Sequence, residues 1–413
     1  MKILLVHQFF LEKDDPGGSR FNEMTRNWVE AGNEVTVLAG MVNYLTGKVP
    51  AKYKGKRFLK EQYQPGLNVL RCKVTESYNA NFLGRLWAYF SFVWYSIRGG
   101  LYKLKGEKFD VILVTSPPLF VGITAWVLSR IKRVPYLFEI RDLWPESAID
   151  SGILTNKFII KMAYWFESFI YKRANKINVL TPAFREKLLE LKGVPNDKII
   201  FIPNAADFEL SDQLLNAFDA ESFKEEIGLK DKFVITYVGA HGVANHLIQL
   251  IDAAELINND KIIFQLIGGG MQKDKLIQEV SNRKLKNVIF RDPVPKAEVF
   301  KYILASDMGA SVLKKVDTFK TIYSNKTFDY MACKKPVLLC IDGVSRELVE
   351  KAACGIYAEP ENAQDIATKA ELYALEEKRC IVEGENGYQY AKKNFDRKVL
   401  AAKYVAELQN LVK

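Results

Sequence analysis

A lysine and an aspartate stand three positions apart in the stretch SNKTFDYMACKKPV, which runs from Ser324 to Val337. If a helix begins here, Lys326 and Asp329 lie one turn apart and can face the same ligand. A lysine ammonium suits a phosphate group, and a carboxylate is a natural acceptor for two neighbouring hydroxyls. The pair therefore indicates a ligand that carries both groups, unless Asp329 is only the polar face of a helix start.

Three glycine-containing turns each follow an apolar run and precede a helical pattern. Their glycines are Gly17 and Gly18 in DPGGSR, Gly239 in YVGAHGVANH, and Gly268 and Gly269 in LIGGG. Glycine lets backbone N–H groups approach a phosphate, and a helix start adds partial positive charge. Each turn could equally be a plain connection between a strand and a helix. The sequence has neither GxGxxG nor GKS/T, which counts against a nicotinamide dehydrogenase and a P-loop NTPase.

Two of the three histidines, His241 and His246, stand in the second of these turns. A zinc site would need a third ligand at a spacing such as HExxH, or a cysteine pair nearby. The sequence provides neither, so we predict no metal here and interpret the turn as a loop that lines a ligand cleft. The five cysteines are scattered without a CxxC pair, which favours a reduced cytosol.

Charge is distributed unevenly along the chain. Residues 1–204 carry a net charge of +12 and residues 205–413 a net charge of −2, which together give the +10 of the whole chain. The basic half contains two segments, at 81–110 and 157–176, that mix aromatic and basic residues. Such segments are typical of helices that lie on anionic lipid, or of core-facing helices with a solvated basic edge.

The presence of two such segments in one half favours association of that half with a membrane surface. The apolar run at 86–97 has about 12 residues, too few for the ~20 that span a bilayer. Its aromatic residues crowd together and do not alternate with a basic stripe, which counts against nucleic acid. The opening MKILLVHQFF is too short for a signal sequence and predicts a buried strand. We expect a cytoplasmic protein that is peripheral on the inner face of the plasma membrane.

Strand-like and helix-like patterns alternate along the chain, as in parallel α/β sheets. One series ends with KIIFIPNA at 198–205, and a second begins with DKFVITYVGA at 231–240. A chain of 413 residues is also long enough for two domains. We predict two Rossmann-like α/β domains with parallel sheets, at 1–205 and 206–390, that face a central cleft at the carboxyl ends of their strands. An amphipathic helix at about 391–413 should pack back on the first.

Four motifs follow one another in the second half: PNAADFEL, LIGGGMQKDKL, NVIFRDPVPKAEV and KTFDYMACKKPV. In this order and spacing they resemble glycosyltransferase family 4, the retaining nucleotide-sugar enzymes of GT-B fold. IPNA at 202–205 matches the segment that opens the family's second domain, and the run from Val294 to Val299 matches its V-P-x-x-E-V box. The resemblance covers most of the chain. It implies a GT-B fold with an acceptor-side and membrane-side first domain and a donor-binding second domain.

The resemblance also implies roles for individual residues. The family's acid before Met-Ala binds the ribose hydroxyls, which implies that role for Asp329, and Lys326 becomes the main cation for the diphosphate. Two departures from the family pattern stand out: Thr321 replaces the second acid, and the donor-phosphate arginine after YVG is missing. The likeness to one branch of the family, described next, puts any role of Thr321 in doubt. The implied donor-binding set is Gly17, Gly18, Gly239, His241, Gly268, Gly269, Val294, Lys326, Thr327 and Asp329.

One branch of the family, which transfers deoxy-amino sugars (L-fucosamine-type) in O-antigen and capsule synthesis, is similar in two further places. It carries S-K-x-F-E-Y-M-A and R-D-L-W-P-E-S, and this chain has SNKTFDYMA and RDLWPESA at 141–148. Arg141 occupies the position of a histidine that touches the donor sugar in the wider family. The resemblance therefore implies Arg141, Asp142 and Glu146 as catalytic or acceptor-side candidates beside Lys326. The alternative is a capped loop in which Arg141 and Asp142 pair with each other.

The implied reaction moves an N-acetyl-deoxyhexosamine from a UDP-sugar to a saccharide on polyprenyl diphosphate, for lipopolysaccharide or another bacterial surface polysaccharide. Retention in this family is commonly explained by same-face attack in which the leaving diphosphate takes the acceptor proton, so no protein nucleophile is needed. No metal or other cofactor is expected, because no DxD motif stands in a strand-end loop. The alternatives are a nucleotide-sugar epimerase or phosphorylase of the same fold, or an inactive membrane-associated assembly subunit.

Overall fold

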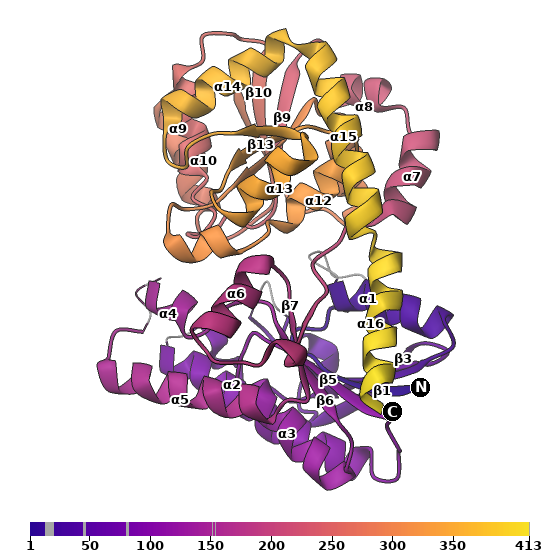
Figure 1. Cartoon of the computed structure of the whole chain (residues 1–413). Coiled ribbons are helices and arrows are strands. Elements are labelled where there is room, and N and C mark those ends of the chain that lie inside the picture. Colours follow the sequence, from indigo (N-terminus) through magenta and orange to yellow (C-terminus); the bar gives the residue numbers. More distant parts are fainter. Residues whose placement is uncertain (13–19, 44–46, 80–81, 151, 153, 413) are drawn as a thin grey trace. The chain divides into compact units, whose positions relative to one another are not determined.

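The computed structural model describes residues 1–12, 20–43, 47–79, 82–150, 152 and 154–412 (Figure 1). The chain divides into two compact units. Of the described residues, the first unit contains 1–12, those from Arg20 to Pro203 and 398–412, and the second contains Asn204–Arg397. The chain therefore crosses between the units at 203–204 and again at 397–398.

An eight-stranded sheet forms the centre of the first unit, in the order β3-β4-β2-β1-β5-β6-β7-β8. Its strands are β1 (Lys2–Val6), β2 (Glu34–Gly40), β3 (Phe58–Gln64), β4 (Leu67–Cys72), β5 (Val111–Thr115), β6 (Tyr136–Ile140), β7 (Lys176–Val179) and β8 (Ile199–Phe201). All neighbours are parallel except β3 and β4, which form an antiparallel hairpin at one edge. The alternation of strands and helices did not predict this hairpin, because no helix separates its strands.

The helices of the first unit are α1 (Arg20–Glu30), α2 (Phe82–Arg98), α3 (Val121–Lys132), α4 (Glu146–Asp150), α5 (Lys157–Arg173), α6 (Pro182–Glu190) and most of α16 (Arg397–Val412). Strands β1, β5 and β6 are almost wholly apolar and buried, as expected for parallel strands covered on both faces. The side chain of Asn156 caps α5 by accepting hydrogen bonds from the amides of Phe158 and Ile159. Helix α2 contains residues 82–98 of the first aromatic-basic segment, and α5 contains residues 157–173 of the second.

A six-stranded, wholly parallel sheet forms the centre of the second unit, in the order β11-β10-β9-β12-β13-β14. Its strands are β9 (Phe233–Val238), β10 (Ile262–Ile267), β11 (Val288–Arg291), β12 (Met308–Val312), β13 (Val337–Cys340) and β14 (Gly355–Tyr357). Its helices are α7 (Phe208–Ala217), α8 (Ala220–Glu226), α9 (Ile248–Leu256), α10 (Lys273–Asn282), α11 (Lys296–Leu304), α12 (Asn325–Ala332), α13 (Val344–Ala352), α14 (Ala363–Leu375) and α15 (Glu377–Phe395).

The C-terminal segment returns to the first unit at residue 398, later than the predicted residue 391. Helix α15 remains in the second unit as far as its end at Phe395. There the amide of Ala206 donates to the carbonyl of Phe395 (2.9 Å), and the amide of Arg397 donates to the carbonyl of Ala206 (3.1 Å). These bonds hold the end of α15 beside the start of the second unit, so the return to the first unit begins only at residue 398.

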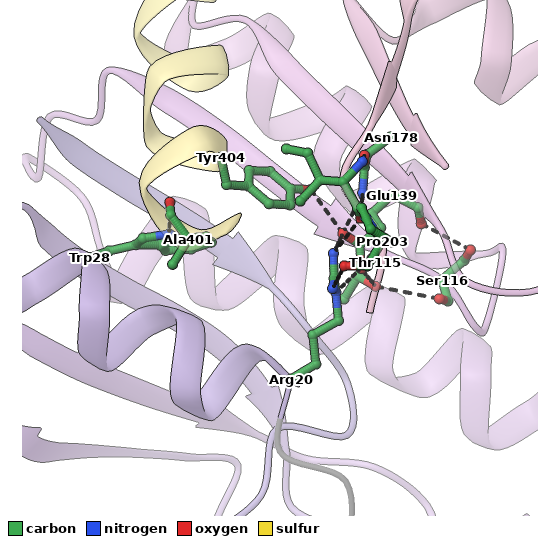
Figure 2. A network of polar contacts seen from close by, with 10 residues as sticks. Arg20, Trp28, Thr115, Ser116, Glu139, Asn178, Pro203, Ala401 and Tyr404 are labelled. Carbon is green, nitrogen blue, oxygen red and sulfur yellow. Dashed lines mark hydrogen bonds and ion pairs between the residues drawn. The ribbon is translucent and has the colours of Figure 1, made fainter. Parts of the chain in front are cut away.

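Arg20 and Glu139, the second-last residue of β6, form a buried ion pair (Figure 2). Arg20 donates through Nε to Glu139 Oε1 (3.1 Å) and through Nη2 to Oε2 (3.0 Å). Arg20 also donates to the carbonyl of Pro203 (2.5 Å), the last residue before the chain enters the second unit. Glu139 accepts from Asn178 Nδ2 (2.9 Å) and from the hydroxyl of Tyr404 (3.0 Å). One pair of charges therefore joins α1, β6, β7, the crossing segment and α16.

We predict that replacing Arg20 by methionine lowers the free energy of unfolding of the first unit by about 3–5 kcal/mol, because Glu139 would keep a buried charge without its partner. Tryptophan fluorescence in urea is a selective measurement, since all six tryptophans lie between Trp28 and Trp165, within this unit.

The matched control is Lys2→Met, which breaks the exposed pair between Lys2 and Glu34. Such a pair contributes at most about 1 kcal/mol. Equal losses in the two variants would contradict a central role for the Arg20–Glu139 pair.

Candidate functional site

The sheet of the second unit has a topological switch point at β9. This strand pairs with β10 on one side and with β12 on the other, so the crossovers to these two neighbours run in opposite directions. In such sheets ligands bind beyond the carboxyl ends of the strands at this point. The turn after β9 and the first turn of α12 are therefore the first places to look for donor-binding groups.

Two of the predicted glycine turns lie against each other at this edge. The amide of Gly239 donates to the carbonyl of Ile267 (3.0 Å), and the amide of His241 donates to the carbonyl of Gly269 (2.9 Å). At Gly268, whose φ is +145°, an added Cβ would lie 1.9 Å from the carbonyl oxygen of Gly239. Only glycine allows this approach, so the structure brings Gly239, Gly268 and Gly269 together.

Lys326 lies beside the first of these turns, in the first turn of α12. A Cβ built on Gly239 would be 3.4 Å from Lys326 Cε, and the Lys326 ammonium lies 4.9 Å from the centroid of the Tyr237 ring. Burial lowers the pKa of Lys326 to about 8, while Asp329 acts in the opposite direction. Ser324, the N-cap of α12, makes no capping hydrogen bond through its side chain. A cation and the start of a helix thus lie together at the switch point, which suits a phosphate.

Tyr330 positions α12 and therefore Lys326, which lies one turn earlier. Its buried hydroxyl accepts a hydrogen bond from the amide of Val238 (3.1 Å) and donates one to the carbonyl of Ala310 (3.0 Å). The helix approaches β12 closely, because a Cβ on Gly309 would lie only 2.2 Å from the Tyr330 ring. One hydroxyl thus joins α12 to both strands of the switch point.

The remaining predicted residues of α12 and its approach differ in orientation. The Thr327 hydroxyl is buried and lies 3.1 Å from that of Ser311 on β12, so it contributes to packing against the sheet. Thr321 is also buried, and its hydroxyl donates to the carbonyl of Thr318 (2.7 Å). Asp329 is half-buried, one turn after Lys326. These positions favour Lys326 and Asp329, rather than Thr327 or Thr321, as side chains that reach a ligand.

His241 is buried between the two glycine turns. A Cβ on Gly268 would lie 3.3 Å from its Nε2 atom, and neither ring nitrogen has a hydrogen-bond partner among the described residues. Burial, assisted by the nearby Lys273, lowers the pKa of His241 to about 4. The imidazole is therefore neutral near pH 7, and it can donate or accept one hydrogen bond.

Val294 is half-buried beyond β11. The preceding residue, Pro293, lies against the second glycine turn, because a Cβ on Gly269 would be 3.1 Å from Pro293 Cγ. The residue before the V-P-x-x-E-V box therefore lies beside Gly269. Gly17 and Gly18 lie outside the described residues.

The first unit has its own switch point at β1, which pairs with β2 and β5. His7 and Gln8 follow β1 directly and are buried. His7 Nδ1 and both side-chain polar atoms of Gln8 have no hydrogen-bond partner in the described part of the chain. Burial lowers the pKa of His7, and the charge of Arg141 lowers it further, so Arg141 lies near this edge.

Sequence analysis did not identify His7 and Gln8 as candidates. The sequence could have indicated them, because a polar His-Gln pair directly follows an apolar strand, at the edge of a sheet where ligands bind. We now include both among the candidate residues of the first unit.

Asp142 and Glu146 lie in a cluster of acids. Asp142 accepts a hydrogen bond from the Ser147 hydroxyl (2.8 Å), and burial raises the pKa of Asp142 to about 6, with a further contribution from Glu146. Glu146 forms an ion pair with Lys192, which also binds Glu167 at 2.7 Å. Burial raises the pKa of Glu167 to about 7. Glu146 thus takes part in a structural ion cluster, while Asp142 can exchange a proton near neutral pH.

In the described part of the chain, no group of three or more His, Cys, Asp or Glu side chains is arranged to hold a metal ion. Among the same residues, every helix is too short or too polar to cross a membrane.

Comparison with known families gives one match for each unit. Residues 17–205 match the family described as "Glycosyl transferase 4-like domain", and residues 232–374 match "Glycosyl transferases group 1". A protein of Escherichia coli (strain K12) named as a colanic acid biosynthesis glycosyl transferase, WcaI, is 22% identical over 99% of this chain and 100% of its own length.

Solved structures give the fold. Sucrose-phosphate synthase from Thermosynechococcus elongatus has a TM-score of 0.76 at 14% identity, covering 99% of this chain and 98% of its own. HepE of Anabaena, in complex with UDP, has a TM-score of 0.72 at 16% identity, covering 99% of this chain and 100% of its own. The predicted pair of α/β units with the GT-B fold is confirmed.

We predict that Tyr330→Phe lowers the free energy of unfolding of the second unit by about 1–3 kcal/mol, because the partly buried amide of Val238 would lose its acceptor. Hydrogen exchange followed by mass spectrometry should show faster exchange in peptides that contain Val238.

The control is Tyr302→Phe on α11, since the Tyr302 hydroxyl makes no hydrogen bond among the described residues. Unchanged protection of Val238 in the Tyr330 variant would show that this hydroxyl does not hold α12 in place.

Proposed function

The chain is a glycosyltransferase, and we propose that it transfers a sugar from a UDP-sugar to a lipid-linked saccharide with retention of configuration. The observation that carries this proposal is the position of Lys326, whose side chain lies against Gly239 at the switch point of the second unit. A diphosphate at this point would meet the ammonium, the start of α12 and the amides of the glycine turns. Each of these groups favours an anion.

Asp329 completes the proposed donor site. It lies one helical turn after Lys326 and is half-buried, so one nucleotide can contact both side chains. A carboxylate accepts two hydrogen bonds from the ribose hydroxyls. HepE, which shares the fold, was solved with UDP, and this supports a uridine nucleotide as the donor.

The proposed catalysis is electrostatic. When the bond from the sugar to the diphosphate breaks, negative charge grows on the diphosphate, and the Lys326 ammonium stabilises that charge. The acceptor oxygen forms the new bond to the sugar on the face from which the diphosphate leaves, and the diphosphate accepts the proton of that hydroxyl. The chain therefore does not have to supply a nucleophile. His241 is neutral and buried near the same turns, and it can add one hydrogen bond without a charge.

The proposed acceptor is a saccharide on polyprenyl diphosphate, and the product belongs to a bacterial surface polysaccharide such as O-antigen or capsule. WcaI, named for colanic acid biosynthesis, supports this class of product. The motifs SNKTFDYMA and RDLWPESA favour an N-acetyl-deoxyhexosamine as the sugar. Arg141 and Asp142, at the carboxyl end of β6, are the proposed acceptor-side groups.

A lipid-linked acceptor agrees with the surface of the first unit. Helices α2 and α5 leave large apolar side chains exposed, including Trp87 (63%), Trp94 (60%), Phe158 (71%) and Trp165 (66%). Exposed tryptophans beside basic residues are typical of proteins that bind a membrane surface. We propose that these two helices lie on the anionic inner face of the plasma membrane.

We predict that Lys326→Ala lowers turnover by at least about 10²-fold, because a charge that stabilises the leaving diphosphate is lost. A thermal-shift screen of UDP-, GDP- and TDP-sugars first selects the donor, and release of the nucleotide in the presence of a lipid-linked acceptor extract then gives the rate.

Lys275→Ala, an exposed lysine on α10, is the matched control. Wild-type turnover in a folded Lys326→Ala variant would refute the proposed donor site.

We also predict that UDP binds more weakly as the pH rises above about 8, the pKa to which burial lowers Lys326, since the diphosphate requires the protonated amine. Above that pH the association constant should fall by up to about tenfold per pH unit. Calorimetry between pH 7 and pH 10 measures this fall. In Lys326→Arg the profile should be flat, because arginine stays charged.

The stability of the ligand-free protein should change in the opposite direction. The pKa of Lys326 is lower in the folded than in the unfolded chain, so the unfolded chain binds more protons between about pH 8 and 10.5. The contribution of Lys326 to stability therefore rises over that interval.

For UDP binding, identical pH profiles in wild type and Lys326→Arg would exclude Lys326 as the titrating group.

A further inference from the structure

An open pocket of about 460 Å³ lies at the amino end of β6, at the opposite edge of the sheet from Arg141 and Asp142. It is lined by the C-terminal part of α3, the turn into β6, and the end of α5 with Asn175. None of the proposed donor or acceptor groups lines it. The pocket is therefore separate from the chemistry proposed above.

Three arginines line this pocket: Arg130, Arg133 and Arg173. All three are exposed, no carboxylate lines the pocket, and none of the three forms an ion pair within the described residues. Burial raises the pKa of Tyr136, and Arg173 and Arg130 both oppose that rise, so two of the cations lie near one hydroxyl. Arg173 donates to the carbonyl of Phe169 (3.4 Å), which leaves other N–H groups of its guanidinium for a ligand. Guanidinium groups that lack a carboxylate partner and gather around one hollow favour a phosphate, which they bind through paired N–H donors.

Trp126 forms part of the pocket wall. The Arg173 guanidinium carbon lies 5.6 Å from the centroid of the Trp126 ring. The ring therefore supplies apolar surface beside one of the three cations.

Aromatic side chains connect the pocket to the exposed surface of α5. The ring centroids of Trp126 and Phe169 are 5.2 Å apart, and those of Phe169 and Trp165 are 5.8 Å apart. Trp165 is two-thirds exposed. Arg173 stacks on Phe169 with its guanidinium carbon 3.6 Å from the ring centroid. Ile131, beside Arg130, is 58% exposed. A soluble phosphate compound would not cover these apolar groups, whereas a lipid brings a phosphate and an apolar surface together.

We propose that Arg130, Arg133 and Arg173 form a binding site for the phosphate headgroup of an anionic phospholipid, with the Trp126 ring as part of its wall. The exposed side chains of α5 then lie in the interfacial region of the bilayer. This site deepens the membrane contact of the proposed function, on which it rests, and it leaves the donor site unchanged.

The test measures binding of the full chain to vesicles of phosphatidylglycerol and phosphatidylcholine, with phosphatidylcholine alone as reference. The variant carries R130Q, R133Q and R173Q, and the charge-matched control carries R26Q, K54Q and K56Q, which lie at exposed positions of the same unit. Each cation at an anionic surface contributes about fivefold, so the pocket variant should partition about 10²-fold more weakly than wild type. The control should stay within about fivefold.

A third variant, with R130K, R133K and R173K, separates a built site from general electrostatic attraction. It keeps the charge but loses the paired donors, so we expect it to bind at least about tenfold more weakly than wild type. Equal loss in the pocket variant and the charge-matched control would overturn the proposal, and so would wild-type binding by the lysine variant. Full competition by millimolar glycerol phosphate, with no preference for vesicles, would identify a soluble phosphate compound instead.

Calorimetry with UDP on the same proteins keeps the two proposals apart. Because the pocket lies outside the donor unit, all three variants should bind UDP as the wild type does. Loss of vesicle binding with normal UDP binding supports the pocket alone. Absence of UDP binding in the wild type would contradict the donor site, while the vesicle result would still decide the pocket.

Discussion

The first unit depends on the buried pair of Arg20 and Glu139. An ionised carboxylate inside a protein is stable only with a partner and further hydrogen bonds, and Glu139 obtains these from segments far apart in the sequence. Arg20 also binds the carbonyl of Pro203, where the chain leaves the unit, and Tyr404 lies on the helix that returns to it. Since Glu139 stands two residues before Arg141, the same pair fixes the end of β6 at which the acceptor-side candidates begin.

In the second unit, close backbone contacts and one hydroxyl position α12 and Lys326. Gly268 allows the turn after β10 to touch the turn after β9, and Gly309 allows Tyr330 to lie against β12. These contacts place Lys326 where its ammonium loses part of its hydration, and its pKa falls to about 8 as a result. An incoming diphosphate would restore the lost stabilisation. The low pKa and the affinity for an anion thus have the same cause.

The sequence predicted those features that depend on local patterns. Apolar runs such as KILLV and FVITYV predicted buried strands, and the three-residue spacing of Lys326 and Asp329 predicted neighbouring side chains on a helix. It did not predict contacts that depend on distant segments. Arg20 and Glu139 are 119 positions apart, and the role of Tyr330 as an anchor depends on Val238, 92 positions earlier. Glu146 resembled a catalytic acid in its motif, but its ion pair with Lys192 became evident only in three dimensions.

The two crossings of the chain impose an order on biosynthesis. The described residues of the second unit form one continuous stretch, from Asn204 to Arg397, so a ribosome delivers all of them before it finishes the protein. The first unit must wait for its last helix, since Trp28 donates to the carbonyl of Ala401 and Glu139 accepts from Tyr404. Until those residues leave the ribosome, the first unit lacks the native partners of Trp28 and Glu139, although most of it was translated before the second unit.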